Sequence, residues 1–493
     1  MVTSNLAFKE KNSIEPEVVV NESPVKWCAV ALSDVVARGK RLEASVFDVE
    51  AKQARATVVN GKYKWHALGG KDGLIQNAYY PGRFKRIYCD KRTGEAFYLP
   101  SQMAEVYPKS EKYISALTKC DISELRLKPN TLLLTRSGTI GTVSLVSKTT
   151  QGKVYSDDVI RVSFNEVYDT GFIYTFLKSK AGSKILTTNG YGSVITHLEP
   201  EHLATVPIPD APTMLKKKIH DLIVRSYELR DESNDLIDQA TALLIGELKL
   251  PDIDAFDVGF YKKAAPVDTF SVRLSEMSGR LDASYHVPIV DAIIEHLKRY
   301  AEEVTTVGDP RISREVILPG RFKRVYVDEG YGRVLIGGKQ LSELDPSSKK
   351  YLSTAKHDKM LKKLEVHEGT TLITRSGTIG KIAIVPKHWE HYIPSDHIIR
   401  VIPANKDIAG YLNIFLASDY GKVLITRFTY GSVVDEIDDN HVRQIAIPLL
   451  KNHTVQKKIN DLALEANEKR YQAYLLEQEA LQIMDRDVIY AKK

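Results

Sequence analysis

The chain has 493 residues, of which 43% are hydrophobic and 27% are charged, and its formal net charge is +6 at pH 7. This size and composition predict two to four globular domains with real hydrophobic cores and exclude a disordered polyelectrolyte. No apolar run is long enough to cross a bilayer, and residues 1–23 lack the apolar stretch of a signal peptide, so we expect a cytoplasmic protein.

Cysteine usage points to no disulfide framework. Cys28, Cys89 and Cys120 lie far apart and show no C-x-x-C spacing. We therefore expect small buried hydrophobes rather than disulfides or a zinc site.

An internal repeat organises the whole sequence. Matching motifs recur at offsets of 238 or 239 residues (319 − 81 and 374 − 135, for example). They are Pro-Gly-Arg-Phe-Lys-Arg at 81–86 and 319–324, Thr-Arg-Ser-Gly-Thr-Ile-Gly at 135–141 and 374–380, Tyr-Gly-Ser-Val at 191–194 and 430–433, and Pro-Ile-Pro at 207–209 against Ala-Ile-Pro at 446–448. Near-constant offsets over this length predict two copies of one fold.

Within each copy, short β-like runs alternate with turn residues. In the first copy, residues 131–135 and 142–146 flank the Ser-Gly-Thr turn as two strands would, and 159–163 alternates as a further strand. Residues 172–186 have the pattern of a helix. Each copy is therefore predicted to be a mixed α/β unit with a twisted sheet.

A long heptad pattern follows each copy, at 212–250 and at 451–487. One inner position carries small residues and the other large ones, which favours two long helices packed on each other. If the helices run antiparallel, the two copies are related by a pseudo-twofold axis. The alternative is two independent amphipathic helices, each packed on its own domain. The large seam residues are Ile219, Leu222, Leu229, Leu236 and Leu243 in the first helix and Ile459, Leu462, Leu476 and Ile483 in the second, where Lys469 interrupts the apolar pattern.

Two kinds of segment could contact DNA. In the Pro-Gly-Arg-Phe-Lys-Arg segments, an extended backbone would turn the phenylalanine inward and the first Arg and the Lys outward, toward phosphates. A charged, protective strand edge is the alternative interpretation. The candidate residues are Arg83, Lys85 and Arg86, and Arg321, Lys323 and Arg324.

The glycine-containing loops are the second kind. Their hydroxyls, backbone amides and guanidinium groups suit phosphate oxygens, although a turn that only connects strands, or a tyrosine that only packs, would have the same sequence. The candidates are Arg136, Ser137, Thr139, Tyr191 and Ser193 in the first copy and Arg375, Ser376, Thr378, Tyr430 and Ser432 in the second.

The sequence shows no catalytic signature. It has no Asn/Asp-Pro-Pro-Tyr/Phe motif for amino-methyl transfer, no S-adenosylmethionine loop, no Walker A motif and no nuclease or zinc-protease motif. Its 13 histidines are scattered, and we interpret His197, His202, His397 and His441 as core or surface residues rather than metal ligands. A non-catalytic chain without a metal is expected.

The duplicated motifs and helices together resemble the specificity subunit of Type I restriction–modification systems, over about residues 27–487. The resemblance implies two target-recognition domains (27–211 and 266–450) and an antiparallel pair of spacer helices, one central (212–250) and one C-terminal (451–493). Residues 251–265 are then a linker, and residues 1–26 are an N-terminal extension. It also implies binding to double-stranded DNA at a bipartite site, to two methyltransferase subunits and to restriction subunits. S-adenosylmethionine would be bound by the methyltransferase partner.

The chain departs from that family pattern in the likeness of its two copies and in its N-terminal extension. Residues that differ between the copies are the candidates for reading different half-sites, namely 196–198 against 435–437 and 91–93 against 329–331. Three alternatives stay open at this point. They are a Type IIB-like specificity chain with other partners, an enzyme with an unrecognised site, and a scaffold that binds only proteins.

Overall fold

The computed structural model describes residues 18–19, 27–37, 40–191, 196–256, 270–277, 279–431 and 433–492. The chain divides into two compact units. Unit 1 comprises Met1–Ala104, Pro108–Glu228 and Leu475–Lys493, and unit 2 comprises Glu105–Tyr107 and Leu229–Tyr474. Each unit therefore contains one α/β copy and a part of both long helices, α6 (Thr213–Glu247) and α12 (His453–Ile483).

The described residues of unit 1 form two four-stranded sheets and two strand pairs. The first sheet has the order β4-β11-β8-β9 and is antiparallel throughout, and the second has the order β10-β6-β7-β5. The strands are β1 (Val18–Val19), β2 (Trp27–Cys28), β3 (Trp65–Ala67), β4 (Ile75–Tyr79), β5 (Tyr88–Cys89), β6 (Gly94–Tyr98), β7 (Lys112–Ser115), β8 (Leu132–Thr135), β9 (Val143–Leu145), β10 (Val154–Tyr155), β11 (Val159–Phe164) and β12 (Pro207–Pro209). The helices are α1 (Leu32–Ala37), α2 (Val49–Val59), α3 (Ile122–Leu125), α4 (Val167–Lys178) and α5 (Lys180–Thr187).

Unit 2 repeats the two four-stranded sheets. Its sheets have the orders β14-β21-β18-β19 and β15-β17-β16-β20, which match the two sheets of unit 1 strand for strand. The strands are β13 (Glu303–Thr306), β14 (Ser313–Ile317), β15 (Tyr326–Val327), β16 (Gly332–Ile336), β17 (Lys350–Ser353), β18 (Thr371–Thr374), β19 (Ile382–Ile384), β20 (Ile393–Pro394), β21 (Ile398–Pro403) and β22 (Ala446–Leu449). The helices are α7 (Pro288–Tyr300), α8 (Thr354–Leu364), α9 (Lys406–Ala417), α10 (Asp419–Thr426) and α11 (Asp439–Arg443).

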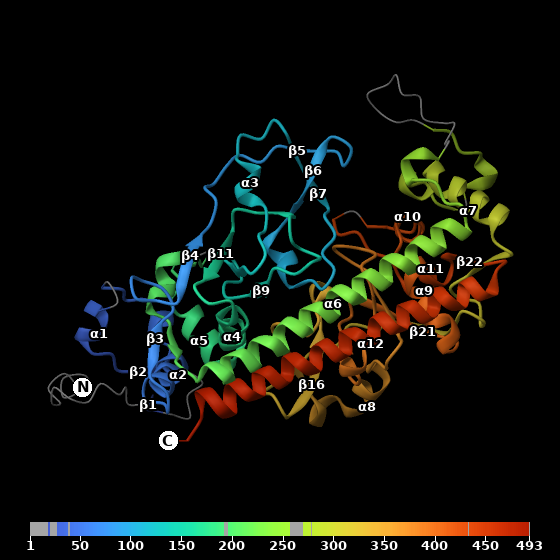
Figure 1. Cartoon of the computed structure of the whole chain (residues 1–493). Coiled ribbons are helices and arrows are strands. Elements are labelled where there is room, and N and C mark those ends of the chain that lie inside the picture. The colour runs from blue at the N-terminus through green and yellow to red at the C-terminus, as the bar shows by residue number, and fades with distance from the viewer. Residues whose placement is uncertain are drawn as a thin grey trace. The chain divides into compact units, whose positions relative to one another are not determined.

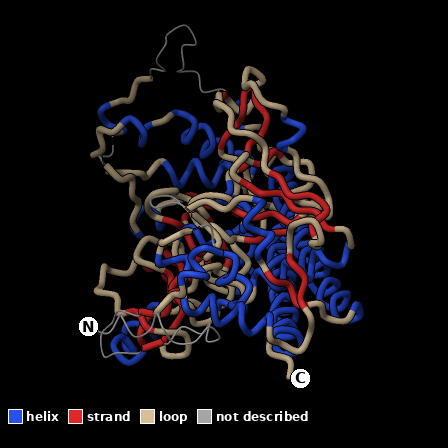
Figure 2. The backbone as a smooth tube through the Cα atoms, turned by 90° about the vertical axis from the view of Figure 1, so that its left-hand side faces the viewer, coloured by secondary structure: helices blue, strands red, loops and turns tan. Residues whose placement is uncertain are grey.

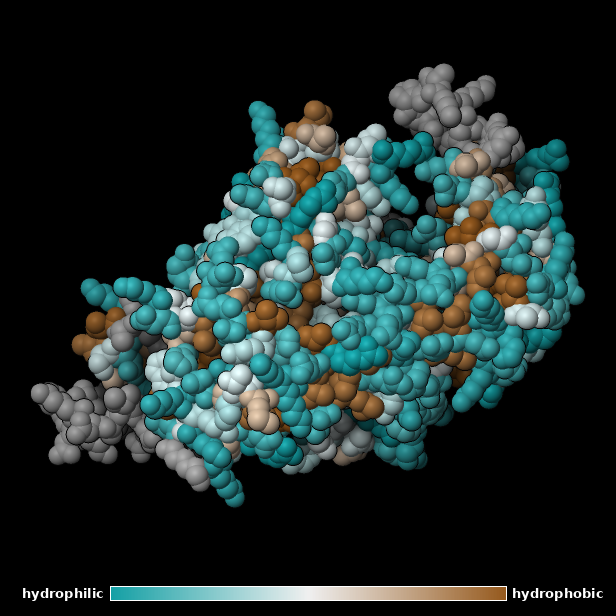
Figure 3. All heavy atoms as spheres, viewed as in Figure 1, coloured by the Kyte–Doolittle hydropathy of each residue, from teal (hydrophilic) through white to brown (hydrophobic). Residues whose placement is uncertain are grey.

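The mixed α/β class and the two long helices are thus confirmed (Figure 2). Cys89 and Cys120 are free, half-buried thiols, whereas the Cys28 side chain and most of the predicted N-terminal extension and linker lie outside the described residues. The face drawn in Figure 3 is largely hydrophilic, with hydrophobic residues in separate patches. Among the described residues, no helix combines the length and the apolarity needed to cross a membrane.

A buried helix of each copy packs closely on one long helix. In unit 1, a Cβ at Gly171 of α4 would lie 2.8 Å from the Cα of His220 on α6, and in unit 2 a Cβ at Gly410 of α9 would lie 2.3 Å from the carbonyl oxygen of Asn460 on α12. The glycine amides also donate hydrogen bonds to these partners, at 3.2 Å to His220 Nδ1 and at 2.8 Å to Asn460 Oδ1. Only glycine permits this backbone approach.

The two long helices run antiparallel inside unit 2. Lys469 Nζ lies 2.6 Å from Glu232 Oε2, and Arg470 Nε donates to Ser233 Oγ at 3.0 Å. Further along, Leu244 of α6 shares a buried cluster with Ile459 of α12, so residue numbers rise on one helix as they fall on the other. Unit 1 likewise buries the start of α6 with the end of α12 in one cluster.

The predicted seam repeats two positions along each long helix. At the second of them, the buried residue is the one that follows the predicted residue in the sequence. Ile219, Leu229, Ile459 and Ile483 are buried as expected, but Leu222, Leu236, Leu243, Leu462 and Leu476 are only half-buried. The two buried rows include Ile219, Ile223, Ser226, Arg230, Ser233, Ala240 and Leu244 on α6 and Ile459, Ala463, Ala466, Ala473, Glu477, Ala480 and Met484 on α12 and the π-turn after it. The small residues are in the seam as expected. Polar residues occupy part of the second position, so the leucine pattern of the sequence does not identify that position.

Alanine substitutions at two neighbouring residues of α6 distinguish the observed seam from the predicted one. Ile223→Ala removes a fully buried side chain and is expected to cost about 2–5 kcal/mol of unfolding free energy, whereas Leu222→Ala should cost clearly less. Urea denaturation followed by circular dichroism measures both. Equal losses, or a larger loss for Leu222→Ala, would contradict the observed seam.

Candidate nucleic-acid interface

In unit 1, the structure brings the loop at 136–141 together with the tyrosine loop. The segment between them is the link, because Leu198 N donates to the carbonyl oxygen of Arg136 at 2.8 Å and His197 N donates to that of Tyr191 at 2.6 Å. The candidate loops, separated by about fifty residues in sequence, therefore form one continuous backbone arrangement.

Unit 2 builds the same arrangement from the second copy. Ile437 N donates to the carbonyl oxygen of Arg375 at 2.9 Å, and Glu436 N donates to that of Tyr430 at 2.7 Å. The segments 196–198 and 435–437, which the sequence singles out because the copies differ there, thus lie in the middle of the candidate site in both units.

Two glycines shape each loop. Gly138 and Gly141 have φ of +77° and +84°, and Gly377 and Gly380 have φ of +74° and +79°. These left-handed conformations favour glycine and fold the strand end back on itself. Nothing lies within 4 Å of a Cβ built at Gly138 or Gly377, so both loop tips face open space.

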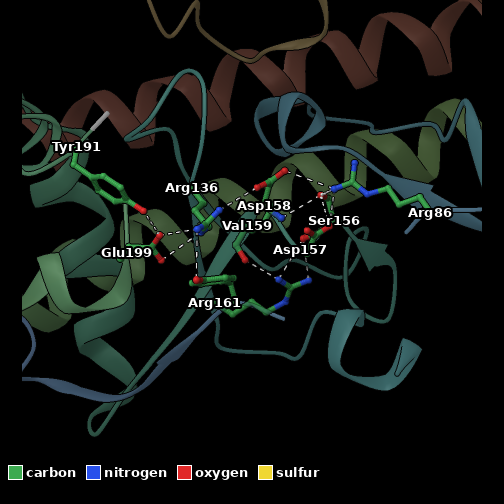
Figure 4. Close-up of polar contacts among 10 residues, drawn as sticks. Arg86, Arg136, Ser156, Asp157, Asp158, Val159, Arg161, Tyr191 and Glu199 are labelled. Carbon is green, nitrogen blue, oxygen red and sulfur yellow. Dashed lines mark hydrogen bonds and ion pairs between the residues drawn. The ribbon is translucent and has the colours of Figure 1, made fainter. Parts of the chain in front are cut away.

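Arg136 is the centre of a polar network in unit 1 (Figure 4). Its side chain is buried, and one terminal nitrogen lies 2.6 Å from Glu199 Oε1 while the other lies 3.4 Å from Asp158 Oδ1. The guanidinium lies over the ring of Tyr80, 4.2 Å from its centroid, and Tyr191 Oη donates to Glu199 Oε1 at 2.7 Å. Arg136 therefore joins the strand end, the turn at Asp158 and the tyrosine loop.

This network sets the protonation of Glu199. Burial alone would raise the pKa of Glu199, but hydrogen bonds from Arg136, Tyr191 and Tyr80 outweigh it and hold the pKa below its usual value. The carboxylate is therefore charged at neutral pH, as an ion pair with Arg136 requires.

The second copy satisfies the equivalent arginine differently. Arg375 pairs with Glu436 and donates from Nε to the carbonyl oxygen of Ile437 at 3.1 Å. Glu436 occupies the position of His197, whereas the counterpart of Glu199 is Asp438, which caps α11 by accepting from His441 N at 2.9 Å. The ion pair is kept, but its acid comes from a residue two positions earlier.

These positions correct the role assigned to Arg136 and Arg375. Both residues were predicted to contact DNA phosphates, but both guanidinium groups have carboxylate partners in the structure, and Arg136 is 5% exposed. A buried arginine with two acidic neighbours is held by them and orients the loop. We assign these two residues to holding the loop in place.

The Pro-Gly-Arg-Phe-Lys-Arg segment of unit 1 shows the expected alternation. Phe84 packs edge-on against Phe97, with 6.5 Å between ring centroids, while Arg83 and Lys85 are exposed. Arg86 turns back and lies 2.6 Å from Asp157 Oδ1, which fixes the segment to the turn before β11. Two of its three cations therefore face solvent.

Unit 2 has the same alternation. Phe322 packs on a buried cluster, Arg321 and Lys323 are exposed, and Arg324 pairs with Asp396. Arg321 also lies 4.0 Å from Glu436, which places this segment beside the loops.

The remaining candidates lie on the loops. Thr139 and Thr378 are exposed at the loop tips, Ser137 is half-buried, and Ser376 Oγ lies 2.7 Å from His397 Nδ1. Tyr191 and Tyr430 are exposed at the edge of each site, and Ser193 and Ser432 lie outside the described residues.

Several residues that hold the site were not singled out from the sequence. Arg161 and Arg400 are buried in the central strands, and burial lowers the pKa of each to about 10; Arg161 donates to the carbonyl oxygen of Leu125 at 3.0 Å. These arginines, like Asp157 and Asp396, recur at the offset of 239, so the repeat itself could have identified them. Glu199 could not be found this way, because its counterpart has another role.

No family model and no curated protein matches the chain. Among solved structures, it is similar to the Type I restriction–modification S subunit from M. genitalium, with 13% identity, a TM-score of 0.34 and coverage of 87% of this chain and 96% of that chain. It is also similar to the HsdS subunit from Thermoanaerobacter tengcongensis (11%, TM-score 0.25, coverage 87% and 98%) and to a chain from a study of type I R-M complex assembly and conformational transition (12%, TM-score 0.27, coverage 84% and 98%).

The assignment of Arg136 can be tested by stability. Arg136→Ala leaves Glu199 and Asp158 without their shared cation and is expected to lower the unfolding free energy by about 2–3 kcal/mol at neutral pH. Because the folded pKa of Glu199 is depressed, its contribution is present above the unfolded pKa and is lost as pH falls through the folded one, so the deficit should shrink in acid. Urea denaturation at several pH values measures it.

Arg83→Ala is the matched control, since this exposed arginine should change stability by less than about 0.5 kcal/mol. A neutral effect of Arg136→Ala would return Arg136 to the list of DNA-contacting candidates.

Proposed function

We propose that the chain is the DNA-recognition subunit of a Type I restriction–modification complex, which reads a bipartite site and directs partner methyltransferase and restriction subunits. The observation that carries the proposal is the construction of one site twice in a single chain. Each copy presents two outward cations beside a glycine loop, and each is docked on one of two antiparallel helices. Two like sites on one chain suit the two halves of a bipartite sequence, since a duplex backbone has twofold symmetry.

The exposed cations are assigned to phosphates. Arg83 and Lys85, and Arg321 and Lys323, project from backbone that is fixed by the following arginine in each copy. Phosphate contacts position a protein on the duplex, whereas base edges supply sequence information. The exposed hydroxyls of Thr139 and Thr378 would add donors at the loop tips.

Positions that differ between the copies are assigned to base reading. Leu198 and Ile437 are buried and Glu436 is paired with Arg375, so these three are removed from that set, which leaves residues 196–197 and 435. The second divergent set, 91–93 against 329–331, is exposed in both units and replaces Lys91 and Arg92 by Glu329 and Gly330. This reversal of charge is where we expect the half-sites to diverge most.

A matched pair of exposed leucines suits two copies of one partner. Leu42 is 82% exposed and Leu281 is 85% exposed, at corresponding positions of the two copies. The arginine before each is fixed, since Arg41 donates to the carbonyl oxygen of Gly190 at 2.8 Å and Arg280 to that of Thr429 at 2.9 Å. We assign these leucines to contacts with two methyltransferase subunits, which would bring S-adenosylmethionine.

The long helices are assigned to the spacing between half-sites. α6 has 35 residues, which corresponds to a length of about 50 Å at 1.5 Å per residue.

A Type IIB-like system would use the same recognition chain with other partners, and the genes beside it distinguish the two. A protein-only scaffold would give no shift of DNA in a gel, with or without methyltransferase.

The proposal predicts a methylation pattern. Cells that carry this chain with its cognate methyltransferase should methylate a bipartite sequence whose halves are related inverted repeats, because the two sites share their architecture. Methylome sequencing measures it, and the purified chain alone should transfer no labelled methyl group to DNA.

Methylation without this chain, or no methylated motif with it, would overturn the proposed function. Two unrelated half-sites would keep the function and reject the inference from the likeness of the copies.

The phosphate assignment predicts a change in salt dependence. Replacing Arg83, Lys85, Arg321 and Lys323 by alanine should weaken binding to all sequences and reduce the slope of log K against log salt by about 3–4, at roughly 0.9 per phosphate contact. Fluorescence anisotropy of the assembled methyltransferase on specific and non-specific duplexes measures it. Arg83→Lys with Arg321→Lys is the control, since it keeps both charges and should keep the slope; an unchanged slope in the alanine variant would contradict the assignment.

A further inference from the structure

Unit 2 brings two histidines and a glutamate together away from the candidate interface. One ligand atom each from His367, Glu390 and His391 lie within 4.8 Å of one another. His367 Nδ1 is 2.6 Å from Glu390 Oε1, and His391 Nδ1 is 3.0 Å from Glu365 Oε2. Imidazole nitrogens and a carboxylate are a donor set suited to zinc and similar divalent transition metals.

Backbone contacts hold the two chain segments of this cluster in register. His391 N donates to the carbonyl oxygen of Val366 at 2.9 Å, and Val366 N donates to that of Tyr392 at 3.0 Å. The amide of Glu368 also donates to Glu390 Oε2 at 2.8 Å, which orients the carboxylate. The three side chains therefore project from a fixed frame.

The first copy has the same frame without the ligands. There Gly152 N donates to the carbonyl oxygen of Leu127 at 2.9 Å, and Leu127 N donates to that of Lys153 at 3.1 Å, each 239 residues before its counterpart. The positions of His367, Glu390 and His391 are occupied in that copy by Lys128, Gln151 and Gly152. The fold accordingly does not need the cluster.

The backbone at His391 adds an independent observation. This position is left-handed in both copies, with φ of +77° at Gly152 and +66° at His391. Glycine adopts this conformation without cost, whereas a residue with a Cβ adopts it at an energetic cost that usually accompanies a specific role. The second copy thus keeps a histidine where the first has the residue that the backbone favours.

We propose that His367, Glu390 and His391 form a binding site for a divalent transition metal of the zinc class, with water as a fourth ligand, because Glu365 already pairs with Arg333. Bonds of 2.0–2.2 Å in a tetrahedral site place ligand atoms about 3.4 Å apart, which small rotations of these side chains reach. The imidazoles are about 58% and 57% exposed, so they are free to turn toward the ion.

Such a metal would tie the segment before β18 to the turn before β20. That turn also contains the buried Trp389, and His388 beside it stacks on Tyr474 of α12 with 4.1 Å between centroids. Bound metal would therefore stabilise the contact of the second copy with its long helix. The proposal is independent of DNA binding.

The test uses the full chain after removal of metals with a chelator. Zn²⁺ titrated by calorimetry should bind at a site that the variants His367→Lys, Glu390→Gln and His391→Gly, each carrying the residue of the first copy, weaken by about 100-fold or more, beyond the 10–100-fold cost of outer contacts. Co²⁺ should give visible absorption bands of a tetrahedral site in the wild type only. His453→Ala, which removes an exposed histidine outside the cluster, is the control and should bind like the wild type.

Measuring the Tm with and without Zn²⁺ distinguishes a metal site from a simple ion pair. Zn²⁺ at about 100 times its dissociation constant should raise the Tm of the wild type by several degrees. Without metal, the His391→Gly variant should have a Tm at or above that of the wild type, because glycine relieves the backbone cost at this position, and it should lose the response to Zn²⁺. If the three variants bind Zn²⁺ and Co²⁺ as the wild type does, or if the wild type shows neither binding nor a Tm response, the proposal is overturned.

Discussion

Each unit depends on one contact, in which a glycine of the buried helix α4 or α9 lies close to the backbone of a long helix. Gly171 meets His220 in unit 1 and Gly410 meets Asn460 in unit 2, and in each case the side chain of the long helix accepts the glycine amide. The helix α4 packs on the sheet β4-β11-β8-β9 and the helix α9 packs on the sheet β14-β21-β18-β19, and both helices also pack on the long helices α6 and α12. The sheet, and with it the candidate site at the strand ends, is therefore fixed relative to the long helix within its own unit.

Much of this architecture follows from the sequence because the chain is duplicated. A constant offset predicts one topology repeated, and the alternation of Arg83, Phe84 and Lys85 predicts which side chains face solvent, since an extended backbone has a period of two. Two features could not be predicted. The acid that pairs with Arg136 is Glu199, 63 residues away, and the seam of the long helices contains Arg230 and Glu477, which a search for leucines passes over.

The polar seam positions have a physical account in unit 1. Glu477 is fully buried, and its carboxylate pairs with Lys178 and accepts from Tyr174 Oη at 3.0 Å. Lys178 and Tyr174 belong to α4, so the charge is matched by the helix that packs on the seam. A buried charge with a complete set of partners costs little stability, and removal of one partner costs much more. Such contacts fix which residues of the long helix meet the α/β copy.

The exchange of acids around Arg136 and Arg375 explains how two copies can diverge without losing their loops. Each arginine needs a carboxylate, because an unpaired guanidinium is costly where it is buried, as in Arg136, or half-buried, as in Arg375. Glu199 supplies it in unit 1, which leaves position 197 to a histidine; Glu436 supplies it in unit 2, which leaves Asp438 to cap α11. The two positions are on alternate residues of one extended segment and therefore on the same side of it. Moving the acid by two residues keeps the loop and changes the half-buried side chain in the middle of the site, so that one scaffold presents two different surfaces.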